Sequence, residues 1–155
     1  MDIATASKKY QEATELFLDL VNSLDEQSLD KSDGEGWTPR QVIHHVADSE
    51  AQSYARLRRL VAEPGTMIQG YDEAAWGENA TLGYSQLPIA ISVAVYSAVR
   101  ASSLEIIERL SEAQLNNSGT HSESGEYTIH NWLDNYINHP RDHAAQIQKI
   151  LTHAK

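Results

Sequence analysis

Two histidines stand four residues apart near the C-terminal end of the chain, His139 and His143. If this segment is helical, residues i and i+4 share one face, so the two imidazoles can converge on one ion. Imidazole nitrogen is a common ligand for zinc, nickel, copper and iron. A catalytic metal site usually has three protein ligands and an open position. The pair therefore predicts a metal site only if a third ligand joins it.

Composition limits the chemistry that this chain can perform. It has 155 residues, 41% of them hydrophobic, which is enough for one globular domain spanning 1–155. Cysteine is absent, so disulfides, thiolate metal ligands and a cysteine nucleophile are excluded. The formal net charge of −10 argues against nucleic acid as a partner and disfavours anionic membranes. No signal peptide and no run of transmembrane length is recognised, which predicts a cytoplasmic protein.

Four segments with helical periodicity must position the histidines. Apolar residues recur at three- and four-residue steps over about 7–24, 38–63, 88–110 and 128–152. Residues 89–95 are rich in β-branched side chains, but the pattern continues too far for a strand. Four amphipathic helices separated by polar gaps predict an all-α four-helix bundle. The gap at 65–85 is long for a bundle connection, and such loops are often functional, so we expect it to cover one end of the bundle.

Two helices carry local signals that bear on the histidines. Thr38, Pro39 and Gln41 form a capping box with proline at the first helical position, which fixes the start of the second helix. Pro140 lies inside the fourth helix, where its ring should clash with the carbonyl of Tyr136 and bend the helix between the two histidines.

Helix phase selects the third ligand. His45 falls at one edge of the apolar face of the second helix, in the same column as Ser49 and Arg56, whereas His44 falls on the solvent side. His139 and His143 lie at the corresponding edge of the fourth helix. Two such edges can meet in a bundle and enclose a polar pocket, so His45 completes the trio. The alternative is that these are hydrogen-bonded structural histidines. His121, His130 and His153 are expected at the surface, as is Asp48.

Two carboxylates are candidates for catalysis. Glu50 falls near the middle of the apolar face of the second helix, where an unpaired carboxylate would be costly. It is either an acid in the pocket or the buried partner of an arginine. Asp72 lies in the long loop, where it either packs within the loop or acts as a general base beside a metal. The substrate pocket is expected to include Arg56, Trp76 and Tyr136.

Three motifs resemble the DinB/YfiT-like superfamily. Residues 41–50 read QVIHHVADSE and resemble the signature of its second helix, and YDEAAW at 71–76 resembles the loop that follows. YINH at 136–139 and HAAQI at 143–147 resemble the closing helix. The resemblance implies a four-helix bundle, often dimeric, with a divalent metal held by His45, His139 and His143. Some YfiT-like members carry a further histidine where this chain has Glu50, so the substrate subclass stays open.

The resemblance implies a metal-dependent hydrolase or a transferase of low-molecular-weight thiols. Zinc or nickel is the expected metal, with iron or manganese as further options. The expected partners are a small-molecule substrate and a second copy of the chain in a homodimer. A different class of function is a dimeric stress-response or binding module whose metal is structural or vestigial. A role in nucleic-acid processing is a third possibility, which the acidic charge disfavours.

Overall fold

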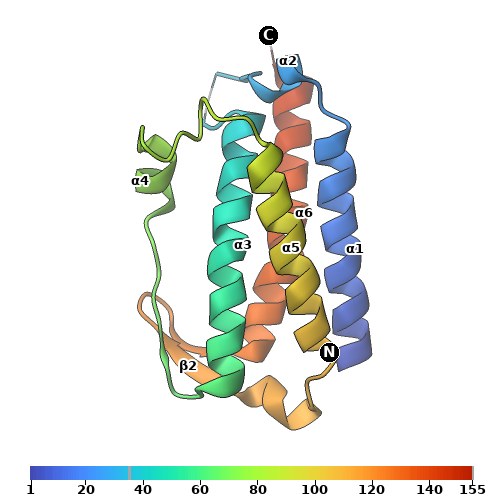
Figure 1. The fold of residues 1–155 in the computed structure, drawn as a ribbon, viewed down its shortest axis with the longest axis vertical. Coiled ribbons are helices and arrows are strands. Elements are labelled where there is room, and N and C mark those ends of the chain that lie inside the picture. The colour runs from blue at the N-terminus through green and yellow to red at the C-terminus, as the bar shows by residue number, and fades with distance from the viewer. Residues whose placement is uncertain (35, 155) are drawn as a thin grey trace.

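Four long helices form the body of the protein. The structure is a computed structural model that describes residues 1–34 and 36–154; Glu35, in the predicted loop after the first helix, and Lys155, the last residue of the predicted domain, lie outside the described residues. The long helices are α1 (Ile3–Asn22), α3 (Pro39–Ala62), α5 (Ala90–Ile107) and α6 (Ile129–His153) (Figure 1). The predicted four-helix bundle is confirmed, and 89–95 belongs to a helix.

Side-chain caps fix where three of these helices begin. Asp2 accepts a hydrogen bond from the backbone N–H of Thr5, so α1 starts earlier than the predicted residue 7. The predicted capping box of Thr38 and Gln41 opens α3. Thr128 opens α6 in the same way, and α6 continues without interruption through Pro140.

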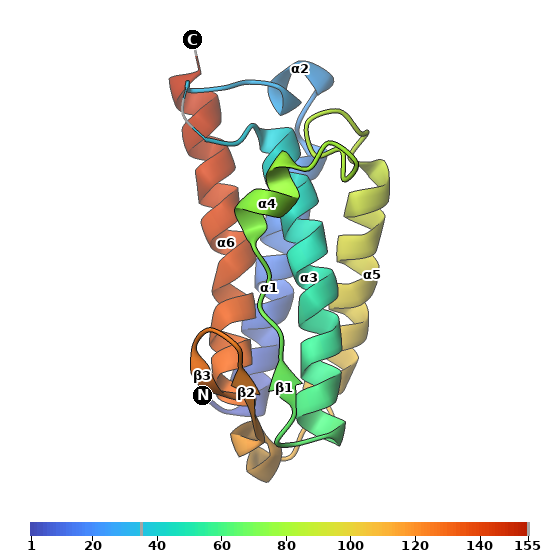
Figure 2. The same ribbon diagram turned by 90° about the vertical axis from the view of Figure 1, so that its left-hand side faces the viewer.

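The directions of the helices explain the long connection. α3 and α5 are neighbours that run in the same direction, so the chain must return along the bundle between them (Figure 1). The return segment contains β1 (Met67–Ile68) and α4 (Glu73–Glu78). It lies along the side of the bundle where α3 and α6 meet (Figure 2). The expectation that it covers one end of the bundle is therefore wrong.

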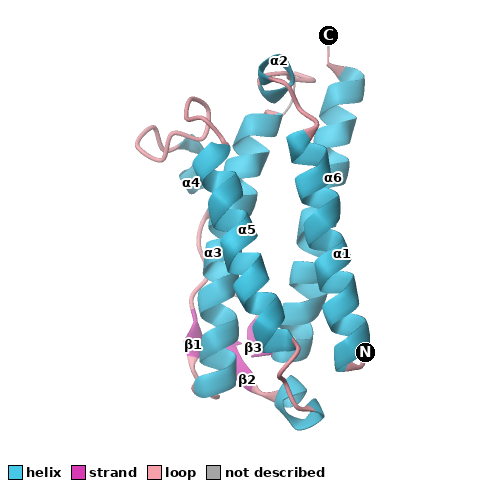
Figure 3. Ribbon diagram, turned by 45° about the vertical axis from the view of Figure 1, so that its right-hand side comes forward, coloured by secondary structure: helices cyan, strands magenta, loops and turns pink. Residues whose placement is uncertain are grey.

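A small sheet at one end of the bundle was absent from the sequence prediction. β1 pairs in parallel with β2 (Ser118–His121), which pairs antiparallel with β3 (Gly125–Thr128) (Figure 3). These strands have two to four residues and lack apolar alternation, so their sequences carry little strand signal. Two other short elements, α2 (Glu26–Leu29) and the 3₁₀-helix η1 (Glu112–Asn116), lie in the polar gaps between the predicted helices.

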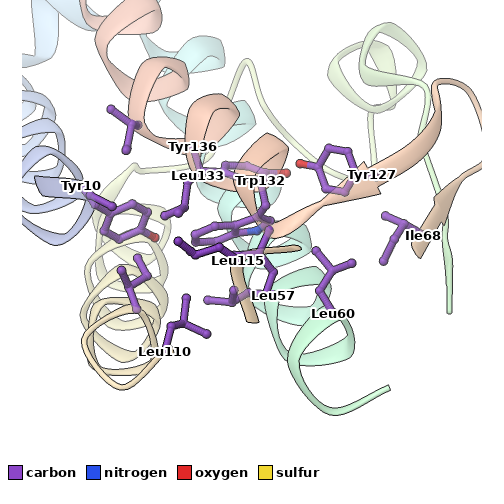
Figure 4. Packing of buried hydrophobic residues seen from close by; sticks show 14 residues of the cluster. Tyr10, Leu57, Leu60, Ile68, Leu110, Leu115, Tyr127, Trp132, Leu133 and Tyr136 are labelled. Atoms are coloured by element: carbon purple, nitrogen blue, oxygen red, sulfur yellow. The ribbon is translucent and has the colours of Figure 1, made fainter. Parts of the chain in front are cut away.

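The core consists of two hydrophobic clusters along the bundle. One cluster includes Tyr10, Leu57, Trp132 and Leu133 (Figure 4). The other includes Phe17, Ile43, Val46, Tyr96 and Ile147. Buried polar residues of α3 and α5 interrupt the apolar interior between them, among them Ser49, Glu50, Ser53, Arg100 and Ser103. Ser49, one member of this polar layer, lines the same cavity as His139.

The helix α5 is unusually apolar for its exposure. Its 18 residues have a mean hydropathy of 1.4, and 22% of them are buried. By length and composition alone this helix could cross a membrane. The prediction from sequence that no segment reaches transmembrane length is therefore wrong. It packs against α3 and α1 as a member of the bundle.

Candidate metal site

Three histidines from α3 and α6 converge on one point of the bundle. One ligand nitrogen from each of His45, His139 and His143 lies within 4.8 Å of the other two. The ring centroids are 5.4 Å apart for His45 and His139, 4.8 Å for His45 and His143, and 4.5 Å for His139 and His143. The structure therefore brings together the three residues that helix phase selected.

The histidine nitrogens have few competing partners. The side chain of His45 is 1% exposed, and neither of its ring nitrogens has a hydrogen-bond partner among the described residues. The same holds for Nδ1 of His139 within residues 1–34 and 36–154. Buried polar atoms are normally hydrogen-bonded, because an unsatisfied group costs about 1–3 kcal/mol. A neutral-imidazole donor set with unsatisfied nitrogens fits a divalent metal ion.

Gln146 orients the third imidazole. The Oε1 atom of Gln146 lies 2.7 Å from Nδ1 of His143, one helical turn away. An amide oxygen only accepts, so Nδ1 of His143 carries the hydrogen and Nε2 keeps its lone pair. Partners of this kind fix the tautomer and the ring direction of metal-ligating histidines.

Arg100 satisfies the backbone carbonyl that Pro140 leaves without a donor. Proline has no N–H, so the carbonyl of Tyr136 loses its intrahelical hydrogen bond. Arg100 Nη1 donates to that carbonyl at 2.8 Å and to Oε1 of Glu50 at the same distance. Its guanidinium also donates to the carbonyl of Tyr10 and stacks on the Tyr10 ring. The arginine thus supports the turn of α6 that carries His139.

Glu50 is the buried partner of an arginine. Both side chains of the Glu50–Arg100 pair are almost fully buried, and Glu50 is absent from the described lining of the cavity beside the histidines. Of the two interpretations of Glu50, the structural ion pair is the one observed. The signal available in the sequence was Arg100 itself, a lone arginine in an apolar segment.

Burial keeps two of the histidines neutral. It lowers the pKa of His45 to about 4 and the pKa of His139 to about 2, and repulsion from the other imidazoles acts in the same direction. Neutral imidazole is the form that binds a metal.

We expect the metal-free protein to lose stability as the pH falls below 6.5. The unfolded chain binds protons near pH 6.5, whereas the folded chain leaves His45 neutral down to about pH 4. The stabilising contribution is therefore complete above pH 6.5 and is lost towards pH 4, up to about 1.4 kcal/mol per pH unit for each group. Urea unfolding of metal-free protein between pH 7.5 and 4.5 measures this slope. His45→Leu should reduce the slope, and an unchanged slope would contradict the assignment.

A cavity of about 490 Å³ opens beside His139. Arg56 and Tyr136, two of the predicted pocket residues, line it together with Ser49, Tyr71 and Glu73. Arg56 donates to Oη of Tyr136 at 3.0 Å and to the carbonyl of Gln69 at 2.8 Å. The third predicted pocket residue, Trp76, is not among the described residues that line this cavity. Its ring packs against the ring of Tyr71, with centroids 4.6 Å apart.

The carboxylate of the long connection that faces the histidines is Glu73. Asp72 is exposed and caps α4 by accepting from the backbone N–H of Ala75 at 2.9 Å. Glu73 Oε2 lies 3.9 Å from His45 Nε2. Of the two interpretations of Asp72, a contact within its own segment is the one observed, because its side chain caps α4. The Asp-Glu pair was visible in the sequence, but the choice between its members depends on how α4 packs.

His44 and Asp48 are not solvated, contrary to expectation. His44 is 5% exposed. Its Nε2–H donates to the carbonyl of Leu87 at 3.0 Å, which leaves Nδ1 to accept from the hydroxyl of Ser92 at 2.8 Å. Asp48 is half-buried and accepts from Oη of Tyr84 at 2.6 Å. The chain before α5 covers this face of α3, which the phase of a single helix does not reveal. Of the expected surface histidines, His153 is exposed, and His121 and His130 are half-buried.

These features define a helical-bundle protein with a three-histidine site whose donors fit a divalent metal. Residues 9–147 match the family model of the DinB superfamily. The chain belongs to that superfamily.

Curated relatives and solved structures agree with this assignment. A protein of Oceanobacillus iheyensis named "Putative metal-dependent hydrolase" is 35% identical over 136 residues, which are 87% of this chain and 77% of the relative. YfiT from Bacillus subtilis, described as "a probable metal-dependent hydrolase with an unusual four-helix bundle topology", superposes with a TM-score of 0.85 at 26% identity. The match covers 96% of this chain and 85% of YfiT. The mycothiol-dependent maleylpyruvate isomerase shares the fold, with a TM-score of 0.75 at 16% identity over 95% of this chain and 61% of the isomerase.

Proposed function

We propose that this protein is a metal-dependent enzyme in which His45, His139 and His143 hold a divalent ion, zinc or nickel. The substrate is a small molecule bound in the adjacent cavity, and the reaction is hydrolysis or transfer of a low-molecular-weight thiol. The observation that carries the proposal is the convergence of three imidazoles with unsatisfied nitrogens beside a cavity of about 490 Å³. The hydrolase names of the relatives support the first reaction. Use of the same fold by a mycothiol-dependent enzyme is the reason for including the second.

The chain's own groups divide the work in the cavity. When bound, a divalent ion supplies Lewis acidity, which polarises an electrophile or lowers the pKa of a nucleophile. His45 and His139 are kept neutral by burial and are ready to ligate. Arg56 holds Tyr136 on the cavity wall through its hydrogen bond to the phenol oxygen. Burial raises the pKa of Tyr136, so this hydroxyl stays protonated and can donate a hydrogen bond to a substrate.

Turnover measurements with defined metal loading test the proposed function. Protein stripped of metal and reloaded with zinc or nickel is assayed against a panel of esters, amides and electrophiles paired with small thiols. We expect turnover that requires the metal, and its loss in His143→Ala. Metal-loaded protein that ligates the ion through these histidines yet turns over nothing in the panel would favour a structural metal.

We also propose that the apolar face of α5 binds a second copy of this chain. Ile91 is 76% exposed, and Val95, Leu82 and Leu87 are exposed beside it. Ala94, Ala98 and Ala101 continue the face, and its first charged residue is Glu105. Small side chains let two helices approach to about 8–10 Å, and an uncharged face about 21 Å long, from residue 91 to residue 104, suits a two-fold contact. The net charge of −10 disfavours an anionic membrane as the occupant.

Light scattering coupled to size-exclusion chromatography tests the dimer. We expect the wild-type chain to elute with twice the monomer mass and Ile91→Glu to elute as a folded monomer with unchanged helical circular dichroism. Leu16, on α1, is another exposed large hydrophobic residue, so Leu16→Glu is the matched control and should stay dimeric. A monomeric wild type, or a dimeric Ile91→Glu, would overturn this proposal.

A further inference from the structure

We propose that Glu73 is the fourth protein ligand of the metal site, and that metal binding therefore fixes α4 against the bundle. This inference rests on the proposed metal-dependent function and adds a residue to its site. Glu73 Oε2 lies 3.9 Å from His45 Nε2 and lines the cavity beside His139.

Charge balance favours a carboxylate at this position. Three neutral imidazoles leave the charge of a divalent ion uncompensated, and carboxylate oxygen is a regular zinc ligand. Among the described residues no lysine or arginine lies within ion-pair distance of Glu73, and its side chain is 57% exposed. It is therefore free to turn towards the histidines.

The packing of α4 explains how Glu73 reaches the site. Gly77, in the last turn of α4, sits directly on the ring of Trp37: a Cβ atom there would lie 2.6 Å from Trp37 Cζ2. The Trp37 ring in turn packs on the His45 ring, with centroids 5.0 Å apart. The absence of a side chain at Gly77 thus allows α4 to lie against the tryptophan that borders the metal site. Gly77 is a positioning residue for Glu73.

Metal affinity is the first readout, measured by competition with a chromophoric chelator for Zn²⁺. We expect Glu73→Gln to bind Zn²⁺ at least about 10-fold more weakly than wild type. Glu78, an exposed glutamate of the same helix, provides the control Glu78→Gln, which should bind as wild type does. Gly77→Ala should weaken binding in the same direction. The double variant should lose little more than Glu73→Gln alone, because both changes act through one contact.

Hydrogen exchange of residues 69–78 is the second readout and does not depend on turnover. Adding Zn²⁺ should slow exchange in this segment for wild type and Glu78→Gln but not for Glu73→Gln. Equal Zn²⁺ affinity and equal protection in Glu73→Gln and wild type would overturn the role of Glu73. In that case, a His143→Ala variant that has lost Zn²⁺ would leave the proposed function intact. Should His143→Ala keep its Zn²⁺ affinity, the three-histidine assignment itself would fail.

Discussion

Replacing His143 with alanine should leave the purified protein almost free of metal. Loss of a residue that only orients a ligand commonly weakens metal affinity 10- to 100-fold, so loss of a ligand should weaken it by at least about 100-fold. The imidazole of His143 supplies one of three converging nitrogens, and Gln146 holds its ring in the ligating tautomer. Elemental analysis of protein purified without added metal is the measurement.

The control for this experiment is His153→Ala. His153 lies in the last turn of the same helix, where its side chain is exposed and its Nδ1–H donates to the carbonyl of Lys149. Both variants remove one histidine from α6, but His153→Ala leaves the metal site intact. Metal content of His143→Ala equal to that of wild type and His153→Ala would reject the site and, with it, the proposed function.

The same variants separate a catalytic from a structural metal. A bound ion stabilises the folded state by mass action in either case, so a rise in melting temperature with Zn²⁺ is expected for wild type. A catalytic metal predicts that metal-free wild type is folded and inactive. A structural metal predicts that metal removal lowers the melting temperature strongly and that no turnover depends on the ligands.

Arg100→Met should destabilise the fold by about 3–5 kcal/mol, the range for removing one partner of a buried ion pair. The change leaves the carboxylate of Glu50 buried without its partner, and it removes the donor for the carbonyls of Tyr10 and Tyr136. For a domain of this size, 1 kcal/mol shifts the melting temperature by about 2–4 °C, so we expect a decrease of roughly 10 °C. Thermal and urea unfolding of the metal-free protein measure both quantities.

A double-mutant cycle with Pro140→Ala isolates the contribution of the Tyr136 carbonyl. Alanine restores an N–H that can donate to this carbonyl within the helix. Arg100→Met should therefore be less destabilising in the Pro140→Ala background, by about 1 kcal/mol. Strictly additive effects of the two substitutions would show that the hydrogen bond from Arg100 to the Tyr136 carbonyl does not stabilise the fold.

Arg58→Met is the control for loss of an arginine that is not fully buried. Arg58 is half-buried, stacks on Tyr54 and donates to Ser102 across to α5. Partly exposed interactions of this kind contribute about 0–1 kcal/mol. If Arg58→Met lowered the free energy of unfolding as much as Arg100→Met does, contact with α5 in general, rather than the buried pair with Glu50, would dominate stability.

Local interactions explain what the sequence already revealed about the fold. The spacing of apolar residues and the Thr38–Gln41 capping box act within a few residues, so they predicted the long helices and the start of α3. The parallel course of α3 and α5 was not predictable in this way, because nothing in the local sequence states the direction of a helix relative to its neighbour. The same applies to β1, which gains its hydrogen bonds from β2, far along the chain.

By itself, the sequence determined which three histidines could converge, since helix periodicity fixes that His139 and His143 share a face and that His45 lies at the edge of a core. Tertiary packing alone decided which carboxylate faces the histidines. Glu50 is paired inside the bundle by Arg100, 50 residues away, Asp72 is used as a cap, and Glu73 faces the histidines because α4 packs on Trp37. A ligand set on regular helices follows from local geometry, whereas the partner of a buried charge depends on contacts between distant segments that no local pattern encodes.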